Sequence, residues 1–137
     1  MGTFDDRIRI KSWDEVPYRE LEDGQRFTKA DVVLESNADS VGDRITRATF
    51  ESVMYYRPDG YCAFVAIMHV TADLAGRAGS FTLSGVGTYS NGNARMNLDI
   101  ISGSGTGDLE SITGSLKSSS TGDDYPHMPV TLQYSLS

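Results

Sequence analysis

The sequence predicts an all-β fold in which eight antiparallel strands close into a small barrel. Short β-rich runs recur between Gly, Asn, Asp and Pro residues along the whole chain, and no helical period of useful length appears. Between Ala48 and Ile100, three tight-turn signals place one apolar face on four successive strands. That face mixes bulky side chains with very small ones, which favours a sheet that closes around a space. We therefore expect an apolar cavity inside the barrel.

The eight strands are expected at residues 3–10, 26–36, 44–56, 61–72, 77–89, 93–102, 111–117 and 130–136. Residues 12–24 contain Trp13 and Pro17 and are expected to cross one mouth of the barrel. Residues 102–109 are rich in Gly and Ser and predict a loop or a single helical turn, and residues 118–129 predict a second loop. Eight strands suit a small closed barrel, and 137 residues suit a single domain spanning residues 1–137.

Three hairpin turns determine which residues face inward, because side chains alternate between the two faces of a strand. Asn91-Gly92 is typical of a type I′ turn. This turn places Gly87 opposite Met96 and Gly85 opposite Leu98. The other face of the same strand is polar, so the apolar face is the inner one.

The two preceding hairpins continue the same inner face. Ala75-Gly76 fits a two-residue turn, and Pro58-Asp59-Gly60 fits a three-residue loop with Gly in the left-handed region. The resulting opposite pairs are Met68 with Leu83, Phe64 with Met54, and Met68 with Phe50. Three separate turns thus agree on one inner surface.

The predicted inner face combines an apolar wall with a few hydroxyl groups. Its candidate ligand contacts are Phe50, Met54, Phe64, Met68, Leu83, Met96 and Leu98, together with the tyrosines Tyr56, Tyr89 and Tyr134. Such a surface suits a hydrophobic or amphipathic small molecule whose carbonyl or hydroxyl group a tyrosine binds. The alternative is an interior filled by the protein's own side chains, in which Gly85 and Gly87 only relieve crowding.

Composition excludes several classes of function. A net charge of −7 opposes binding to nucleic-acid phosphates, and no apolar stretch approaches the length of a membrane helix. The first residues lack the layout of a signal peptide, so we expect a cytoplasmic protein. Cys62 is the only cysteine, which excludes an internal disulfide. Because metal-spaced ligand sets, nucleophile elbows and phosphate loops are missing, we expect no metal and no cofactor and assign no catalytic residue.

The outward face of the third and fourth expected strands is unusually apolar. It carries Val53, Tyr55, Tyr61, Ala63, Val65 and Ile67. A patch of this kind rarely remains exposed to water. We therefore expect a homo-oligomer, a dimer or a trimer, that buries it.

Three segments resemble a known family. They are the Lys-Ser-Trp-Asp-Glu run at residues 11–15 with Pro17-Tyr18 after it, the segment at residues 76–81, and the Gly-Ser-Gly-Thr-Gly loop at residues 103–107. The chain resembles an uncharacterised bacterial family, domain of unknown function 3224, built on an allene oxide cyclase-like barrel. The resemblance implies an eight-stranded, allene oxide cyclase-like or lipocalin-like barrel that often forms oligomers. It also implies a glutamate at the position of Met68 and a histidine at that of Gly85, and this chain has neither.

Two functions fit these observations. The first is a non-catalytic carrier or sensor that binds a hydrophobic or amphipathic small molecule, since the predicted interior lacks a carboxylate and an imidazole. The alternative is a cofactor-independent isomerase or cyclase that holds a flexible apolar substrate in a reactive shape for ring closure. Plant allene oxide cyclases use related barrels in this way. A solidly packed interior would indicate a purely structural role.

Overall fold

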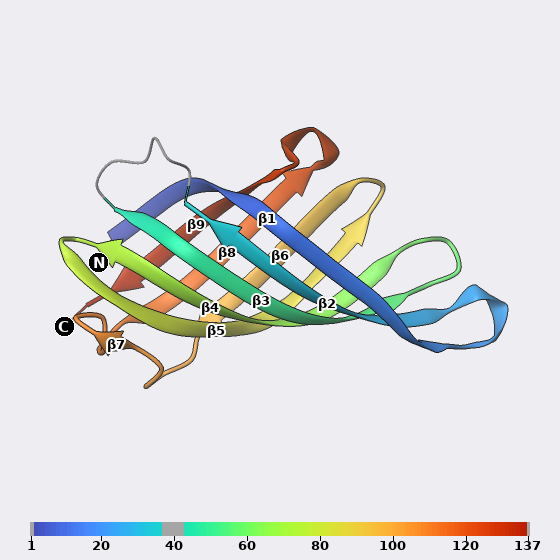
Figure 1. The fold of residues 1–137 in the computed structure, drawn as a ribbon, viewed down its shortest axis with the longest axis horizontal. Helices are drawn as coiled ribbons and strands as arrows, with labels where there is room; N and C mark the ends of the chain where they lie inside the picture. The colour runs from blue at the N-terminus through green and yellow to red at the C-terminus, as the bar shows by residue number, and fades with distance from the viewer. Residues whose placement is uncertain (1, 37–42, 137) are drawn as a thin grey trace.

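In the computed structural model, which describes residues 2–36 and 43–136, nine antiparallel strands form one sheet (Figure 1). The strands are β1 (Gly2–Glu20), β2 (Arg26–Glu35), β3 (Arg44–Tyr56), β4 (Cys62–Leu74), β5 (Arg77–Ser90), β6 (Asn93–Ile100), β7 (Thr106–Gly107), β8 (Thr113–Thr121) and β9 (His127–Ser135). Two short 3₁₀ helices, η1 (Glu22–Gly24) and η2 (Gly122–Asp124), lie between strands. The predicted all-β, antiparallel class is confirmed.

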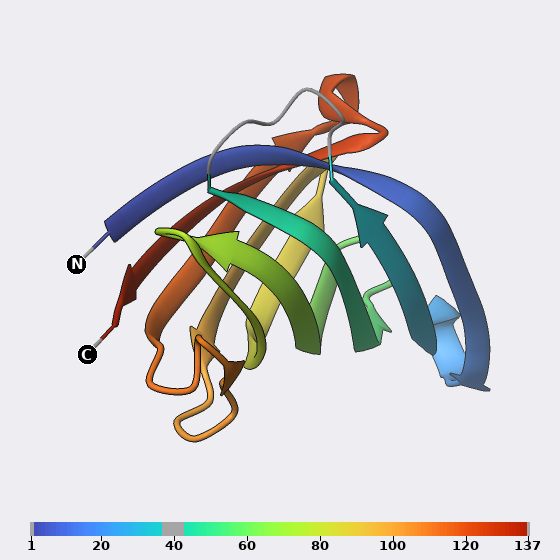
Figure 2. The same ribbon diagram turned by 60° about the vertical axis from the view of Figure 1, so that its left-hand side comes forward.

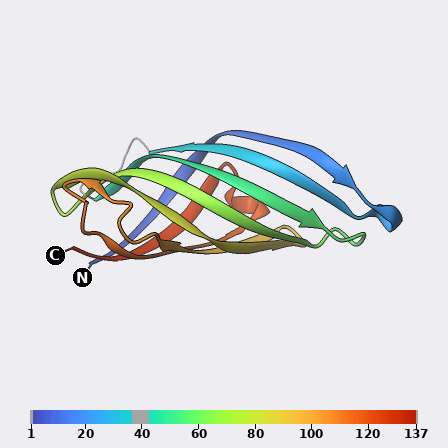
Figure 3. The same ribbon diagram turned by 90° about the horizontal axis from the view of Figure 1, so that it is seen from below.

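Eight of the strands pair in a closed ring. The sheet runs in the order β4, β3, β2, β1, β9, β8, β6, β5, and β5 pairs with β4 to complete the ring. The short β7 pairs with β5 outside this order. The two termini lie side by side at one end of the ring, and the β1–β2 hairpin projects from the other (Figures 2 and 3).

The predicted hairpin registers are confirmed. Gly85 lies opposite Leu98, Met68 opposite Leu83, and Phe64 opposite Met54. The two-residue turns have the left-handed backbone expected of type I′, with φ of 53° at both Ala75 and Asn91. The inner face of β3 to β6 is therefore the one that turn chemistry predicts.

The half of the ring nearest the termini is packed solid. Residues 101–112 lie at this end of the ring (Figure 1), and two of their own side chains, Leu109 and Ile112, are buried in the core. They join a continuous core to which every strand except β7 contributes; its fully buried members include Ile8, Leu34, Met68, Leu83, Leu98, Leu116 and Leu132. Burial of these apolar side chains is the main source of stability for this end of the fold.

Strand β1 is much longer than predicted. Residues 12–20, expected in a loop, continue pairing with β2 as far as Glu20 opposite Arg26. The pairing passes from Ile10 opposite Leu34 to Ser12 opposite Val33, so Lys11 is an extra residue, a β-bulge. Because a bulge shifts the side-chain alternation by one residue, odd-numbered positions face inward from Trp13 to Pro17, where a second register shift, between Pro17 and Arg19, changes the alternation again. Strands β8 and β9 also extend into the region expected to be a loop, reaching Thr121 and beginning at His127.

Neighbouring atoms already occupy the space that a side chain would take at the inward glycines Gly85 and Gly87. A methyl group added at Gly85 would overlap the Asn97 carbonyl oxygen of β6, and one added at Gly87 would overlap the Phe64 ring. These glycines thus admit neighbouring backbone and side chain. Gly85 and Gly87 therefore relieve crowding, in agreement with the alternative given above, and do not create empty space.

We predict that Gly85→Ala lowers the free energy of unfolding by about 2 to 3 kcal/mol, because the overlapping atom is backbone and cannot rotate away. Gly122→Ala is the control, since its added methyl meets nothing within 4 Å and its effect should stay within about 0.5 kcal/mol. Urea unfolding of both variants measures the difference. Equal stability of the two variants would contradict the packing described for β5 and β6.

Candidate functional site

A cavity of about 540 Å³ lies at the end of the ring opposite the termini, where the β5–β6 turn and the β8–β9 connection contribute to its lining. Its wall is mainly apolar and comes from β1, β3, β4, β5, β6, β8 and β9. The apolar and aromatic lining residues are Ile10, Trp13, Phe50, Met54, Tyr56, Phe64, Tyr89, Ala94, Met96, Tyr125 and Met128. Its volume and its mainly apolar lining fall within the range found for small-molecule sites in other proteins.

Six of the ten predicted ligand contacts line this cavity: Phe50, Met54, Tyr56, Phe64, Tyr89 and Met96. The other four lie elsewhere. Met68, Leu83 and Leu98 face inward as predicted, but they are buried in the packed half of the ring. Tyr134 is buried as well, and its hydroxyl donates to Asp43 Oδ2 at 3.0 Å. The cavity therefore occupies only part of the interior.

A carboxylate on the cavity wall, Glu15, receives three hydrogen bonds. The hydroxyls of Tyr56 and Thr28 donate to Glu15 Oε2 at 2.6 and 2.7 Å. The indole N–H of Trp13 donates to Glu15 Oε1 at 3.0 Å. The guanidinium of Arg26 lies over the Tyr56 ring, 4.3 Å from its centroid. We call Trp13, Glu15, Thr28 and Tyr56 the polar anchor of the cavity.

The ionisable groups at the polar anchor each keep a single protonation state near pH 7. Burial raises the pKa of the Glu15 carboxyl, but the hydrogen bonds from Tyr56, Thr28 and Trp13 outweigh this effect and hold the pKa below the ordinary 4.5. Burial, together with the bond to Glu15, raises the pKa of the Tyr56 hydroxyl. Burial and the negative charge of Glu15 raise the pKa of the neighbouring Cys62 thiol to about 11. Near pH 7 the carboxylate is charged, whereas the hydroxyl and the thiol keep their protons.

Sequence reasoning missed Glu15 and Trp13 because it placed residues 12–24 in a loop, whereas β1 continues through them after the Lys11 bulge. In β1 the even-numbered residues Phe4 and Ile8 face inward before the bulge, and Trp13 and Glu15 do so after it. The available signal was the apolar alternation of β2, since Glu15 pairs with the buried Ala30. His127, in a segment expected to form a loop, also lines the cavity. The expectation of an interior without a carboxylate and an imidazole is therefore wrong, because Glu15 and His127 both lie on the cavity wall.

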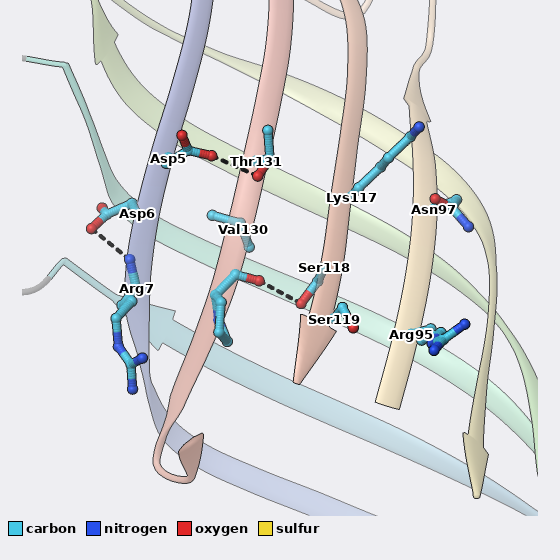
Figure 4. Close-up of a pocket in the computed structure, with 11 residues that line it drawn as sticks. Asp5, Asp6, Arg7, Arg95, Asn97, Lys117, Ser118, Ser119, Val130 and Thr131 are labelled. Atoms are coloured by element: carbon cyan, nitrogen blue, oxygen red, sulfur yellow. Dashed lines mark hydrogen bonds between the residues drawn. The ribbon is translucent and has the colours of Figure 1, made fainter. Parts of the chain in front are cut away.

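A second hollow, of about 880 Å³, lies on the outer face of β1, β9, β8 and β6 (Figure 4). It is more open than the interior cavity, and Pro129 and Val130 lie in its wall beside charged and hydroxyl side chains. Asp5 accepts a hydrogen bond from the Thr131 hydroxyl at 2.6 Å, and Arg7 pairs with Asp124 at 3.3 Å. Lys117 and Asn97 extend from neighbouring strands (Figure 4). Because the lining of this hollow is as polar as it is apolar, whereas that of the interior cavity is mainly apolar, the interior cavity is closer to the usual lining of a small-molecule site.

Within residues 2–36 and 43–136, no group of three His, Cys, Asp or Glu side chains is placed to hold a metal ion. The same residues include no helix with the length and apolar character needed to span a membrane.

Comparisons with known proteins identify the family of the chain. The family model for DUF3224, described as a protein of unknown function, matches residues 2–134. A crystal structure of a DUF3224 protein of unknown function from Shewanella oneidensis MR-1 has a similar fold, with a TM-score of 0.69 and 18% sequence identity. The alignment covers 99% of each chain. No curated protein matches the chain. The chain belongs to the DUF3224 family of proteins of unknown function.

Proposed function

We propose that this protein is a non-catalytic carrier or sensor that binds a hydrophobic or amphipathic small molecule inside the ring. The observation that carries the proposal is the cavity of about 540 Å³, with an apolar wall and one hydrogen-bonded carboxylate. This volume falls in the range of known small-molecule sites, about 300 to 1,000 Å³. Apolar contacts with Phe50, Met54 and Phe64 supply affinity, and the polar anchor fixes the orientation of a polar group on the ligand.

The ligand group that meets the anchor is a hydrogen-bond donor. Glu15 is ionised and accepts through both oxygens, and Oε1 carries only the Trp13 bond. A carboxylate oxygen has room for a further donor. A hydroxyl, amide or amine group on an otherwise apolar molecule therefore suits this position.

The protonation states of Glu15, Tyr56 and Cys62 favour binding over acid–base catalysis by these three groups. A general acid or base works best when its pKa lies near the working pH. The pKa of Glu15 is lowered, and the pKa values of Tyr56 and Cys62 are raised, so these groups move away from neutrality.

The second candidate is a cofactor-independent isomerase or cyclase that acts by positioning its substrate. Trp13 and Phe50, which meet edge to face with ring centroids 6.0 Å apart, favour it because rigid aromatic walls restrict the shape of a flexible substrate. We propose in addition that the ring is a barrel of the allene oxide cyclase-like or lipocalin-like type, the architecture that this chemistry resembles.

We predict that Ser120→Phe weakens binding of the neutral apolar dye Nile red by at least about tenfold, because its ring fills the cavity. Ser119→Phe is the matched control: Ser119 is the adjacent residue on β8 and is exposed on the outer face. Dye fluorescence gives the affinities, and thermal unfolding checks that both variants fold. Unchanged affinity in a folded Ser120→Phe variant would refute binding in the cavity.

We further predict that Glu15→Gln lowers the free energy of unfolding at pH 7 by about 1 kcal/mol, a modest value because solvent reaches this site. The folded-state pKa of Glu15 is lowered, so its contribution is complete above pH 4.5 and is lost as the pH falls through that lower pKa. The difference in free energy of unfolding between the wild type and Glu15→Gln therefore becomes smaller in acid. Glu20→Gln, on the exposed end of β1, is the control. Urea unfolding of the wild type and both variants, from pH 7 down to below pH 4.5, measures this difference in free energy of unfolding. A difference that does not change with pH would contradict the role of the carboxylate.

A further inference from the structure

The charge that a ligand meets on the wall of the interior cavity is negative. Of the described Asp, Glu, Lys and Arg residues, only Glu15 and Arg95 line the cavity. Arg95 lies on β6 between Ala94 and Met96, which face inward, so its side chain lies on the outer face of the sheet (Figure 4). The Glu15 carboxylate therefore determines the charge that the cavity presents.

Glu15 has no cationic partner of its own. Among the described residues, no Lys, Arg or His forms an ion pair with it. Its hydrogen-bond donors are neutral groups, those of Trp13, Thr28 and Tyr56. The Arg26 guanidinium lies against the Tyr56 ring instead, 4.3 Å from the ring centroid. A charged group in a mainly apolar site is stabilised by a partner of opposite charge, and a cationic ligand would supply one.

Aromatic rings lie beside the carboxylate. Trp13 and Tyr56 both donate to it, and Phe50 meets Trp13 edge to face. The face of an aromatic ring attracts an ammonium or guanidinium group, because the π electrons make that face electronegative. The Tyr56 ring already binds one cation in this way, the guanidinium of Arg26. A carboxylate next to such rings favours a positively charged group over a neutral donor.

The carboxylate also has room for one more N–H donor. Glu15 Oε2 accepts two hydrogen bonds, from Tyr56 and Thr28, whereas Oε1 accepts only the bond from Trp13. Each carboxylate oxygen can accept about two hydrogen bonds. An ammonium N–H suits the remaining position on Oε1, because a hydrogen bond between two charged groups is stronger than one from a hydroxyl or an amide. A quaternary ammonium group has no N–H and cannot form this bond.

We propose that the cavity binds protonated primary amines with an apolar chain or ring, and that Glu15 selects them against alcohols and carboxylic acids of the same size. The inference rests on the proposed function and narrows it to one class of ligand. The ammonium group lies against Glu15 Oε1, and the apolar part lies on Met54, Phe64 and Met96. A carboxylic acid in the same place would bring two negative charges together. The net charge of −7 acts in the same direction.

Three eight-carbon probes that differ only in their polar group test this selectivity: octylamine, 1-octanol and octanoate. Trp13 is the only tryptophan, so its fluorescence reports binding beside Glu15. At pH 7, where octylamine is protonated, and in about 150 mM salt, octylamine should bind at least about tenfold more tightly than 1-octanol. Octanoate should bind at least about tenfold more weakly than 1-octanol.

These titrations separate the selectivity from the proposed function. If 1-octanol binds but octylamine binds less than about tenfold more tightly, the proposed selectivity is wrong and binding in the cavity stands. Octanoate that binds as tightly as 1-octanol would contradict the selectivity as well. If none of the three probes binds, both the selectivity and the proposed function are wrong.

Removal of the charge tests the role of Glu15. Glu15→Gln keeps the size of the side chain and one acceptor oxygen, so the preference for octylamine over 1-octanol should fall to within about threefold. Asp14→Asn is the matched control, because it makes the same change of charge at the adjacent residue, which is exposed on the other face of β1, and it should keep the preference. A preference that persists in Glu15→Gln, or is lost in Asp14→Asn, would overturn the role of Glu15. Thermal unfolding checks that both variants fold, and the comparison of probes on the wild type needs neither variant.

Discussion

Strict alternation of side chains along a closed ring of strands is the constraint on which this structure depends. Each inward position must be filled by its own side chain, by a neighbour, or by a ligand. Near the termini, Met68, Leu83 and Leu98 fill the interior, and Gly85 admits the backbone of β6. At the other end the side chains stop short of closing the space, and a cavity remains.

The Lys11 bulge brings polar chemistry into that cavity. Without it, β1 would continue with even-numbered residues inward, and Glu15 would face water. With it, the carboxylate meets Tyr56 and Thr28 at 2.6 and 2.7 Å. One extra residue therefore determines whether the cavity is purely apolar or carries an anchor for a polar group.

The turns made most of the fold predictable, and the bulge limited prediction of the site. Asn91-Gly92 and Ala75-Gly76 specify both a backbone conformation and a register, so the inner face of β3 to β6 followed from them. Gly85 was misleading, because a missing side chain can mean space or close packing, and only the position of β6 decides between them. Glu15 was missed because residues 12–24 were expected in a loop, and because nothing local in residues 10–12 identifies the bulge that turns Glu15 inward. How far the cavity extends depends on residues 101–112, which close the opposite end.

Neighbouring residues on the same strand face opposite sides of the ring. On β3, Met54 lines the cavity, while Val53 is exposed on the outside. The central claim is that the cavity, with its polar anchor, receives a small amphipathic molecule. Because Trp13 is the only tryptophan, its indole N–H gives a single signal in a ¹H–¹⁵N NMR spectrum, at the atom that contacts Glu15. Titration with a medium-chain alcohol should shift this signal in a saturable way. A Trp13 signal that stays fixed while signals from the outer strand faces move would contradict the claim.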